Sequence, residues 1–366
     1  MADLKTILRE TSVIFGLKNK PVAGITAQDY IEFLKENIVN YKALEKELEK
    51  ITVGNEFNNH QQILTNGFNI GQSILNRKQL KGNVVWMGAQ VKNEYPYDIS
   101  IGDYGVSLKE ESYILKNPAL ADYLNSLTQY NPPFKAVHIF REFAPELFEA
   151  WFDYTLRSLF ATTKDGDVIY DNEKRECKLI RGAKNVTFTC DDTNVTINED
   201  EKLTEKQFNN KVGGYLIEYV FAKWISDKMS KDAKYLELKK ACSEKAGENI
   251  IAFIKQNMNI DKKKILALFQ IYDIKYLYAK HGNPPILLEV PSINDVDFDI
   301  INIESSVPKS QLNVLFKFRF KSNGKESDIN VRVECRYSHG QFKGIPEAKL
   351  YYENQEEINN IYNAIP

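Results

Sequence analysis

The sequence predicts an α/β protein of the α+β type, in which helical and β-rich stretches follow one another in blocks. Apolar residues recur near a 3.6-residue period over 27–51, 58–80, 138–160 and 205–280, which is typical of amphipathic helices. Polar and apolar residues alternate over 165–200 and again after residue 285, which is typical of strands. We therefore expect helices and sheets in separate segments.

The first half of the chain shows the order helix, helix, hairpin, helix. Thr26 can cap a helix from Ala27 to Ile51, and a second helix over 58–80 ends at the turn Lys81-Gly82-Asn83. The β-forming segments NVVWMGAQV, DISI and VSLK follow, the last two around a GDYG turn, which predicts a hairpin. Helices are expected again over 118–127 and 138–160.

The second half is expected to contain a small antiparallel sheet over 165–200, helices over 205–280 and strands in the tail. HGNPP, residues 281–285, predicts a boundary because it combines Gly, Asn and Pro. The tail reads ILLEV, FDIINIESS, LNVLFKFRF, an Asn-Gly turn and INVRVECRY, which predicts strands and a hairpin.

Composition limits the classes of function. The chain has 366 residues, 43% of them hydrophobic and 27% charged, and 48 basic against 50 acidic residues give a net charge of −2. This balance excludes a disordered chain and argues against a general polycation for nucleic acid. Neither a GxxxxGK[ST] loop nor a GxGxxG after a strand is present, so no nucleotide cofactor is expected.

Cysteine spacing and apolar runs predict the compartment. The four cysteines are scattered without CxxC spacing, so we expect four free thiols in a reducing cytosol. The N-terminus lacks the apolar core of a signal peptide, and no apolar run reaches the roughly 18 residues of a membrane span. A cytoplasmic protein without a membrane partner is expected.

The sharpest local feature is YPYDISIGDYGVSLKEES, residues 95–112. Asp98 opens one short strand of the predicted hairpin and Lys109 ends the next. Side chains alternate along a strand, so Ser107, Lys109 and Glu111 can share one face. The hairpin can bring a carboxylate and an ammonium group together at its open end, where the carboxylate can hold Mg²⁺ and the lysine can stabilise charge on a phosphate.

At these residues the sequence resembles the PD-(D/E)xK nuclease superfamily, particularly type II restriction endonucleases. Their hairpin carries an Asp and then a (D/E)-x-K triplet at the end of the following strand. The resemblance runs from the helix before Asn83 to Leu124. It implies a central mixed sheet flanked by helices, Mg²⁺ as cofactor, cleavage of double-stranded DNA at a short sequence, and a homodimer. Asp98, Ser107, Lys109 and Glu111 would be the catalytic residues.

The chain departs from the family pattern at two places. Pro96 lies two residues before Asp98 rather than directly before it, and Ser107 replaces the acidic residue of the triplet in Ser107-Leu108-Lys109. Another residue must then supply the second metal-binding carboxylate. Glu56 ahead of the preceding helix is the first choice and Glu111 the second, and Asp122 in the next helix is the third. The alternative is that Asp98 and Lys109 form an ordinary surface ion pair.

The segment 329–352 contains a second group of candidate residues. Alternation puts Arg332, Glu334 and Arg336 on the polar face of a strand, and Ser338, His339, Gln341 and Lys343 follow. Arginine reads guanine, glutamine reads adenine, and lysine suits phosphate. Arg332, Arg336, Ser338, His339, Gln341 and Lys343 therefore form a predicted DNA-reading segment, and a solvated face with cross-strand charge pairs is the alternative.

These predictions divide the chain into three regions. Residues 1–160 would form the nuclease core with its N-terminal helices, 161–285 a mixed β and helical region, and 286–366 a β-rich region with the DNA-reading segment. Two other functions stay open at this point. One is a defence or toxin nuclease acting on RNA or single-stranded DNA, and the other is a non-catalytic DNA-binding module in which Ser107 marks a dead site.

Overall fold

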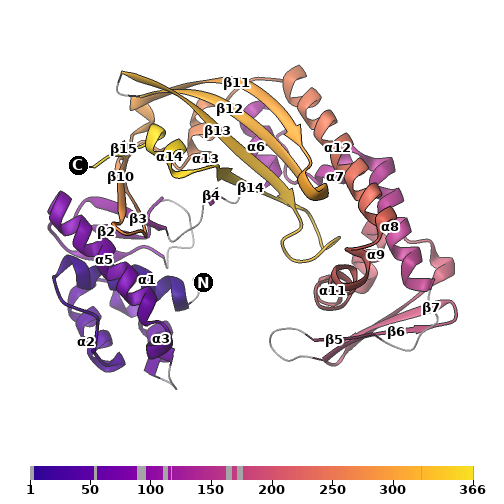
Figure 1. Ribbon diagram of the computed structural model, residues 1–366, viewed down its shortest axis with the longest axis horizontal. Helices are drawn as coiled ribbons and strands as arrows, with labels where there is room; N and C mark the ends of the chain where they lie inside the picture. Colours follow the sequence, from indigo (N-terminus) through magenta and orange to yellow (C-terminus); the bar gives the residue numbers. More distant parts are fainter. Residues whose placement is uncertain are drawn as a thin grey trace.

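The computed structural model describes residues 4–52, 56–88, 96–109, 114–116, 118–161, 167–170, 176–322 and 324–365, with the backbone alone for residues 56, 114–116, 167, 168, 170 and 364. Figure 1 shows an arch. The N-terminal helices and a first sheet form one leg, a long sheet spans the top, and helices with a third sheet form the other leg. No helix of the described ranges is long and apolar enough to cross a membrane. The predicted α+β class is confirmed.

The sheet of the first leg combines segments from both ends of the chain, in the order β1-β2-β3-β9-β10-β15. Neighbouring strands are antiparallel except β3 and β9, which are parallel. A parallel pair needs a long crossover, and here the second sheet's strand β4, the whole second leg and several helices lie between the two strands. The strands are β1 (Val84–Trp86), β2 (Ile99–Ile101), β3 (Tyr104–Lys109), β9 (Tyr276–Lys280), β10 (Ile286–Val290) and β15 (Asn363–Ala364).

Two sequence expectations differ from this sheet. The sheet crosses both expected region boundaries, at 160 and 285, because it takes strands from before residue 110 and after residue 275. Tyr276–Lys280 was expected to be helical and is strand β9 instead, with all five residues buried. A central strand that is covered on both faces reads as a continuous apolar run, which periodicity cannot separate from a buried helix.

Helices α1 (Leu4–Leu17) and α5 (Gln61–Lys78) pack closely in the first leg. A Cβ on Gly16 would lie 2.1 Å from Phe68 O, and one on Gly71 would lie 2.1 Å from Val13 O, so the two backbones meet at glycines. The N-terminal helices bury their apolar residues in one cluster with Val106 and Leu108 of β3 and Leu277 of β9. One face of the first sheet is therefore covered by these helices.

The predicted helix over 27–51 is broken in the structure. It is α2 (Ala27–Asn37), a 3-10 turn at Tyr41–Ala43, α3 (Glu45–Leu48) and a second turn at Glu49–Thr52. The break falls where Ile38 forms a parallel bridge to Val84 of β1, and Val39 N donates to Val84 O at 3.0 Å. α4 (Glu56–Asn59) and α5 then replace the single helix expected over 58–80.

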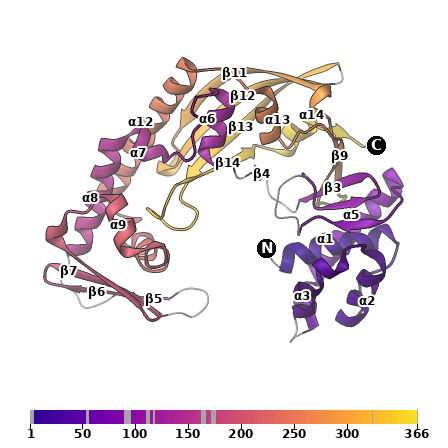
Figure 2. The same cartoon turned by 180° about the vertical axis from the view of Figure 1, so that it is seen from behind.

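The spanning sheet has the order β11-β12-β13-β14-β4 and is antiparallel. Helices α6, α12 and α13 cover one of its faces, which Figure 2 shows from the helical side. The bounds are β11 (Val296–Ser306), β12 (Leu312–Ser322), β13 (Lys325–Arg336), β14 (Glu347–Tyr352), β4 (Ile114–Lys116), α6 (Leu120–Leu127), α12 (Ala233–Gln256), α13 (Lys262–Leu268) and, after the sheet, α14 (Gln355–Ile361). The β-rich tail was predicted.

The second leg contains the third sheet, a meander with the order β5-β6-β7-β8, as predicted for 165–200. Its strands are β5 (Asp167–Tyr170), β6 (Glu176–Gly182), β7 (Asn185–Cys190) and β8 (Thr193–Asn198). The helical elements of this leg are α7 (Ile139–Phe143), α8 (Pro145–Phe160), α9 (Glu205–Val212), α10 (Gly214–Leu216), a π-helix at Ile217–Phe221, α11 (Ala222–Trp224) and a π-helix at Ile225–Met229.

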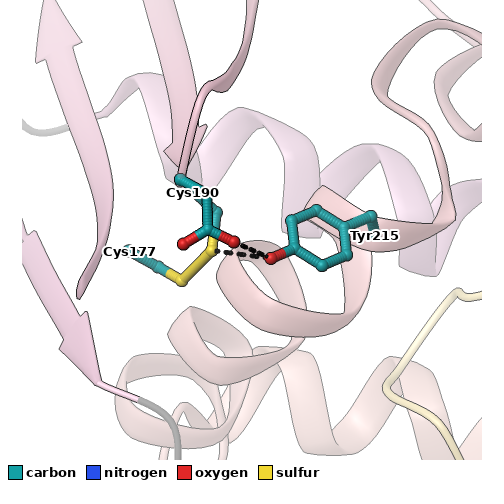
Figure 3. The surroundings of a disulfide bond; sticks show 4 residues. Cys177, Cys190 and Tyr215 are labelled. Atoms are coloured by element: carbon teal, nitrogen blue, oxygen red, sulfur yellow. Dashed lines mark hydrogen bonds between the residues drawn. A yellow bond between two sulfur atoms is a disulfide. The ribbon is translucent and has the colours of Figure 1, made fainter. Parts of the chain in front are cut away.

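A disulfide in the meander corrects the expectation of four free thiols. Cys177 and Cys190 are register partners on β6 and β7, and their sulfurs are bonded (Figure 3). The Tyr215 hydroxyl lies 3.7 Å from Cys190 Sγ. Antiparallel pairing brings together two cysteines that no short spacing connects, which explains why the CxxC criterion missed them. Cys242 and Cys335 are free and buried.

Candidate active site

The β2–β3 hairpin holds Asp98 through its backbone. Asp98 N donates to Val106 O at 3.0 Å, and Met87 N donates to Asp98 O at 2.9 Å. The turn itself is tight, because Gly102 has a φ of +58° and its N donates to Asn83 O at 2.9 Å. Asp98 is thus fixed between neighbouring strands at the end of the hairpin opposite the turn.

The Asp98 carboxylate turns toward the end of β3. Its Oδ2 accepts a hydrogen bond of 2.6 Å from Leu108 N, and Ser107 Oγ lies 3.5 Å from the same oxygen. Ser107 is buried, and Lys109 at the end of the strand is half-buried. The structure therefore brings the Asp98 carboxylate to Ser107 and Leu108, the residues that precede Lys109 on β3.

A further carboxylate, which the sequence analysis missed, comes from helix α1. Glu10 is only 4% exposed, and Trp86 Nε1 of β1 donates to its Oε2 at 2.6 Å. Burial raises the pKa of the Glu10 carboxyl to about 8, and the negative charge of Asp98 adds to the rise. The charges of Arg9 and Lys109 act on this pKa in the opposite direction. Glu10 thus lies within electrostatic reach of both Asp98 and Lys109.

A lone acidic residue inside an apolar helix is the signal that could have found Glu10. The helix reads LKTILRETSVIFGL, and Glu10 is buried together with Ile7, Leu8 and Val13. A buried carboxylate without a bonded cation is costly, so such a residue either becomes neutral or serves a site. The sequence analysis did not assign this segment to a helix and so had no face on which to find the residue.

The other carboxylates considered for the second metal ligand are placed differently. Glu56 begins α4, and only its backbone is described; Glu111 lies outside the described residues. Asp122 is exposed in the first turn of α6, where its Oδ2 accepts from Ala119 N at 2.9 Å. Asp122 therefore caps a helix under the spanning sheet instead of approaching Asp98, which corrects that assignment.

The oxygen donors at the hairpin suit a hard cation. Glu10 and Asp98 are carboxylates close enough to perturb one another, and Mg²⁺ binds carboxylate oxygens while keeping several waters. No group of three His, Cys, Asp or Glu side chains suited to a metal ion is found within the described ranges. The residues present therefore fit a Mg²⁺ ion held by two carboxylates and completed by water or substrate.

The predicted DNA-reading residues lie at the end of β13 and in the loop to β14, where carboxylates accompany them. Lys343 forms an ion pair with Glu218 of the π-helix at Ile217–Phe221, and Ser338 Oγ donates to Glu347 Oε2 at 2.5 Å. His339 lies between the same two carboxylates, 3.9 Å from Glu218 and 3.6 Å from Glu347. The structure brings these residues together, already in contact with acidic groups.

The arginines of this segment also lie near a carboxylate. The guanidinium groups of Arg332 and Arg336 lie 3.9 Å and 3.7 Å from the carboxylate of Glu334, on the same strand. Arg332 also lies over the Tyr351 ring at 4.5 Å. Gln341 Nε2 is buried without a hydrogen-bond partner among the described residues. Charge pairs across strands were the alternative in the sequence analysis. Arg332 and Arg336 pair along β13, whereas Asp328 of the same strand pairs across to Lys317 and Arg319 of β12.

Buried Phe342 fixes the loop that carries these residues. Its ring packs 4.7 Å from Trp151 and 5.3 Å from Phe152 of α8, and its φ is +64°. Tyr337 at the start of the loop bonds His138 Nε2 at 3.0 Å. The loop is therefore anchored in the second leg, and its polar side chains are held on a rigid support.

Searches with protein-family models, against curated proteins and against solved structures give no match for this chain.

Proposed function

We propose that this protein is a Mg²⁺-dependent endonuclease that hydrolyses phosphodiester bonds of double-stranded DNA at a short specific sequence. The observation that carries the proposal is the convergence of Glu10, Asp98 and Lys109 at one end of a hairpin in a mixed sheet. Two interacting carboxylates and an ammonium group are what metal-assisted phosphodiester hydrolysis requires. The departure at Ser107 is offset by Glu10, which supplies a carboxylate from another element.

Glu10 and Asp98 would hold the metal ion. When bound, Mg²⁺ would polarise the scissile phosphate and lower the pKa of a bound water. Leu108 N fixes the orientation of the Asp98 carboxylate, and Trp86 Nε1 fixes that of Glu10. The side chains of the site are thus oriented by groups of the folded core, and metal binding needs little rearrangement of them.

Lys109 acts on the substrate. Its ammonium group has three N–H donors and no acceptor, so it can orient the attacking water and stabilise the negative charge that develops on the phosphate oxygens. In the hydrolysis the water oxygen bonds to phosphorus, the bond from phosphorus to the leaving oxygen breaks, a proton passes from the attacking water to solvent, and the leaving oxygen takes up a proton from solvent. Ser107 lies beside Asp98 and cannot replace the missing carboxylate as a charged ligand.

Two parts of the proposal, the duplex substrate and the homodimer, are what the family resemblance implies. Two copies would place two equivalent sites on the two strands of a symmetric target. The near-neutral net charge of −2 fits such a protein because the basic residues are needed locally. The anchored loop 337–346 between β13 and β14 is the candidate for reading bases.

The test is cleavage of supercoiled plasmid, single-stranded DNA and RNA in parallel, with Mg²⁺ and with EDTA. Discrete plasmid fragments that need Mg²⁺, and that disappear with Asp98→Ala and with Lys109→Ala, are expected. Both variants should still bind DNA. Cleavage of RNA or single-stranded DNA alone would show a nuclease for that substrate instead of duplex DNA. Binding of DNA without any cleavage would indicate a non-catalytic DNA-binding module. Sequencing the fragment ends would identify the target.

A further inference from the structure

The end of strand β1 contacts the residues of both candidate metal ligands. Trp86 is the last residue of the strand, and its Nε1 donates to Glu10 Oε2 at 2.6 Å. Met87 is the next residue, and its backbone N donates to Asp98 O at 2.9 Å. Glu10 comes from α1 and Asp98 precedes β2, so this strand end connects two elements that are far apart in the sequence. The relative position of the two carboxylates therefore depends on where the end of β1 is held.

Asn40 holds that strand end with its side chain. Its Oδ1 accepts a hydrogen bond of 2.9 Å from Trp86 N, and its Nδ2 donates to Trp86 O at 2.7 Å. β1 is the outermost strand of the first sheet, and on its outer side Val39 N donates to Val84 O at 3.0 Å. The chain then enters the 3-10 turn Tyr41–Ala43. The Asn40 amide thus makes the pair of hydrogen bonds that the backbone of another strand residue would make.

We propose that Asn40 is a positioning residue of the metal site, which acts through Trp86 on Glu10. Trp86 is only 3% exposed, so its ring is confined by packing once its backbone is fixed. Groups that orient metal ligands matter almost as much as the ligands, and their loss lowers metal affinity by about 10- to 100-fold. The inference rests on the proposed nuclease function and adds to it a residue that contacts neither metal nor substrate.

Asn125 of α6 provides a matched control, because it makes the same pair of hydrogen bonds elsewhere in the fold. Its Nδ2 donates to Phe134 O at 2.9 Å, and Phe134 N donates to its Oδ1 at 2.8 Å. Asn40 and Asn125 are both half-buried. Replacing either by alanine removes one donor and one acceptor that bond the backbone of a distant residue. A general loss of stability should therefore appear in both variants, and a loss of metal binding only in Asn40→Ala.

The experiment measures binding of Mg²⁺ alone by isothermal titration calorimetry, without DNA, and the dependence of plasmid cleavage on the Mg²⁺ concentration. In Asn40→Ala the Kd for Mg²⁺ should rise roughly tenfold, and the Mg²⁺ concentration for half-maximal cleavage should rise with it. At saturating Mg²⁺ the cleavage rate should return to within about threefold of the wild type, because the ligands themselves are intact. Asn125→Ala should keep the wild-type Kd for Mg²⁺ to within about twofold, although urea unfolds both variants at a lower concentration.

Two further variants cover the case in which Asn40→Ala fails to fold. Asn40→Ser keeps a polar group at this position, and Trp86→Phe keeps an aromatic ring but removes the N–H that bonds Glu10. Each should raise the Kd for Mg²⁺ by about three- to tenfold.

A wild-type Kd for Mg²⁺ in a folded Asn40 variant, with Mg²⁺ binding and cleavage by the wild type intact, would overturn the positioning role and leave the nuclease proposal standing. Equal rises in Asn40→Ala and Asn125→Ala would also overturn it, because they would show only a general loss of stability. If the wild-type protein neither binds Mg²⁺ nor cleaves DNA, the proposed function fails and the positioning role falls with it.

Discussion

Two buried glutamates in the two legs of the arch show opposite ways of placing a carboxylate in a core. Glu205 of α9 is 1% exposed, forms an ion pair with Arg141, and accepts a hydrogen bond of 2.8 Å from Asn209 Nδ2. Glu10 of α1 is 4% exposed, accepts from Trp86, and has the like charge of Asp98 nearby. Burial raises the pKa of both carboxyls.

The difference lies in the neighbouring charges. At Glu205 the guanidinium of Arg141 opposes the effect of burial on the pKa. At Glu10 the charge of Asp98 reinforces burial, and its effect on the pKa exceeds that of Arg9 or Lys109. A carboxylate paired with a cation inside the fold is a structural element. One crowded by another carboxylate is suited to a ligand that brings positive charge.

The largest expected effect is on catalysis. Glu10→Gln should lower the rate of Mg²⁺-dependent cleavage by at least about a hundredfold, the lower end of what a group acting directly on the reaction supplies. Glu205→Gln should leave the rate within about threefold, because Glu205 lies in the other leg. Initial rates on plasmid at saturating Mg²⁺ measure both. Equal losses in the two variants would remove the distinction between the glutamates.

The second prediction concerns the disulfide in the leg that contains Glu205. The Cys177–Cys190 bond closes a short loop, and removing it with Cys177→Ser and Cys190→Ser should cost about 3 kcal/mol of stability in the chain-entropy account. Denaturant melts with and without a thiol reductant measure this. Plasmid cleavage by the folded double variant should be unchanged at low temperature. A matching loss of cleavage would show that the second leg supports the candidate site.

The third prediction compares the free energies of unfolding of the wild type and Glu10→Gln in EDTA, as a function of pH. In the folded protein the Glu10 carboxyl keeps its proton up to about pH 8, whereas in the unfolded chain it loses the proton near pH 4.5. The folded state therefore binds more protons between these values, and this contribution to stability is lost as the pH rises through that window. Glu10→Gln should remove this fall in stability with rising pH. At pH 8 the variant should be more stable than the wild type by on the order of 1–2 kcal/mol.

Glu205→Gln should have the opposite sign at the same pH, since it leaves the Arg141 guanidinium without its carboxylate. Urea melts at pH 5, 6.5 and 8 in EDTA give both values. Adding Mg²⁺ should narrow the gap between wild type and Glu10→Gln, because only the wild type gains the ion. A Glu10→Gln variant less stable than wild type at pH 8 would show that Glu10 is structural.

How much of the site could be predicted depended on distance along the chain. Asp98, Ser107 and Lys109 belong to one hairpin, so strand alternation and a glycine turn were enough to bring them together. Glu10 comes from α1, where Trp86 Nε1 of β1 donates to its carboxylate, and the β3–β9 pairing of the same sheet spans the whole second leg. Local periodicity does not reveal contacts between segments so far apart in the sequence. It also cannot separate a fully buried strand from a buried helix, which is why Tyr276–Lys280 was expected to be helical.

The smallest expected effect concerns the charged face of β13. Arg336 already lies near Glu334, so a contact with a base would have to replace that carboxylate, and Arg336→Ala should weaken specific binding by only about 1 kcal/mol. The loss should be smaller on a duplex of random sequence, which offers phosphates but no matched base.

Arg157→Ala is the matched control, because Arg157 on α8 pairs with Asp153 in the second leg and is highly exposed. Equal losses on both duplexes would make Arg336 a backbone contact, and no loss on either would leave the Arg336–Glu334 pair as a feature of the sheet alone. In that case base reading would have to come from the anchored loop, where Gln341 is the next residue to replace.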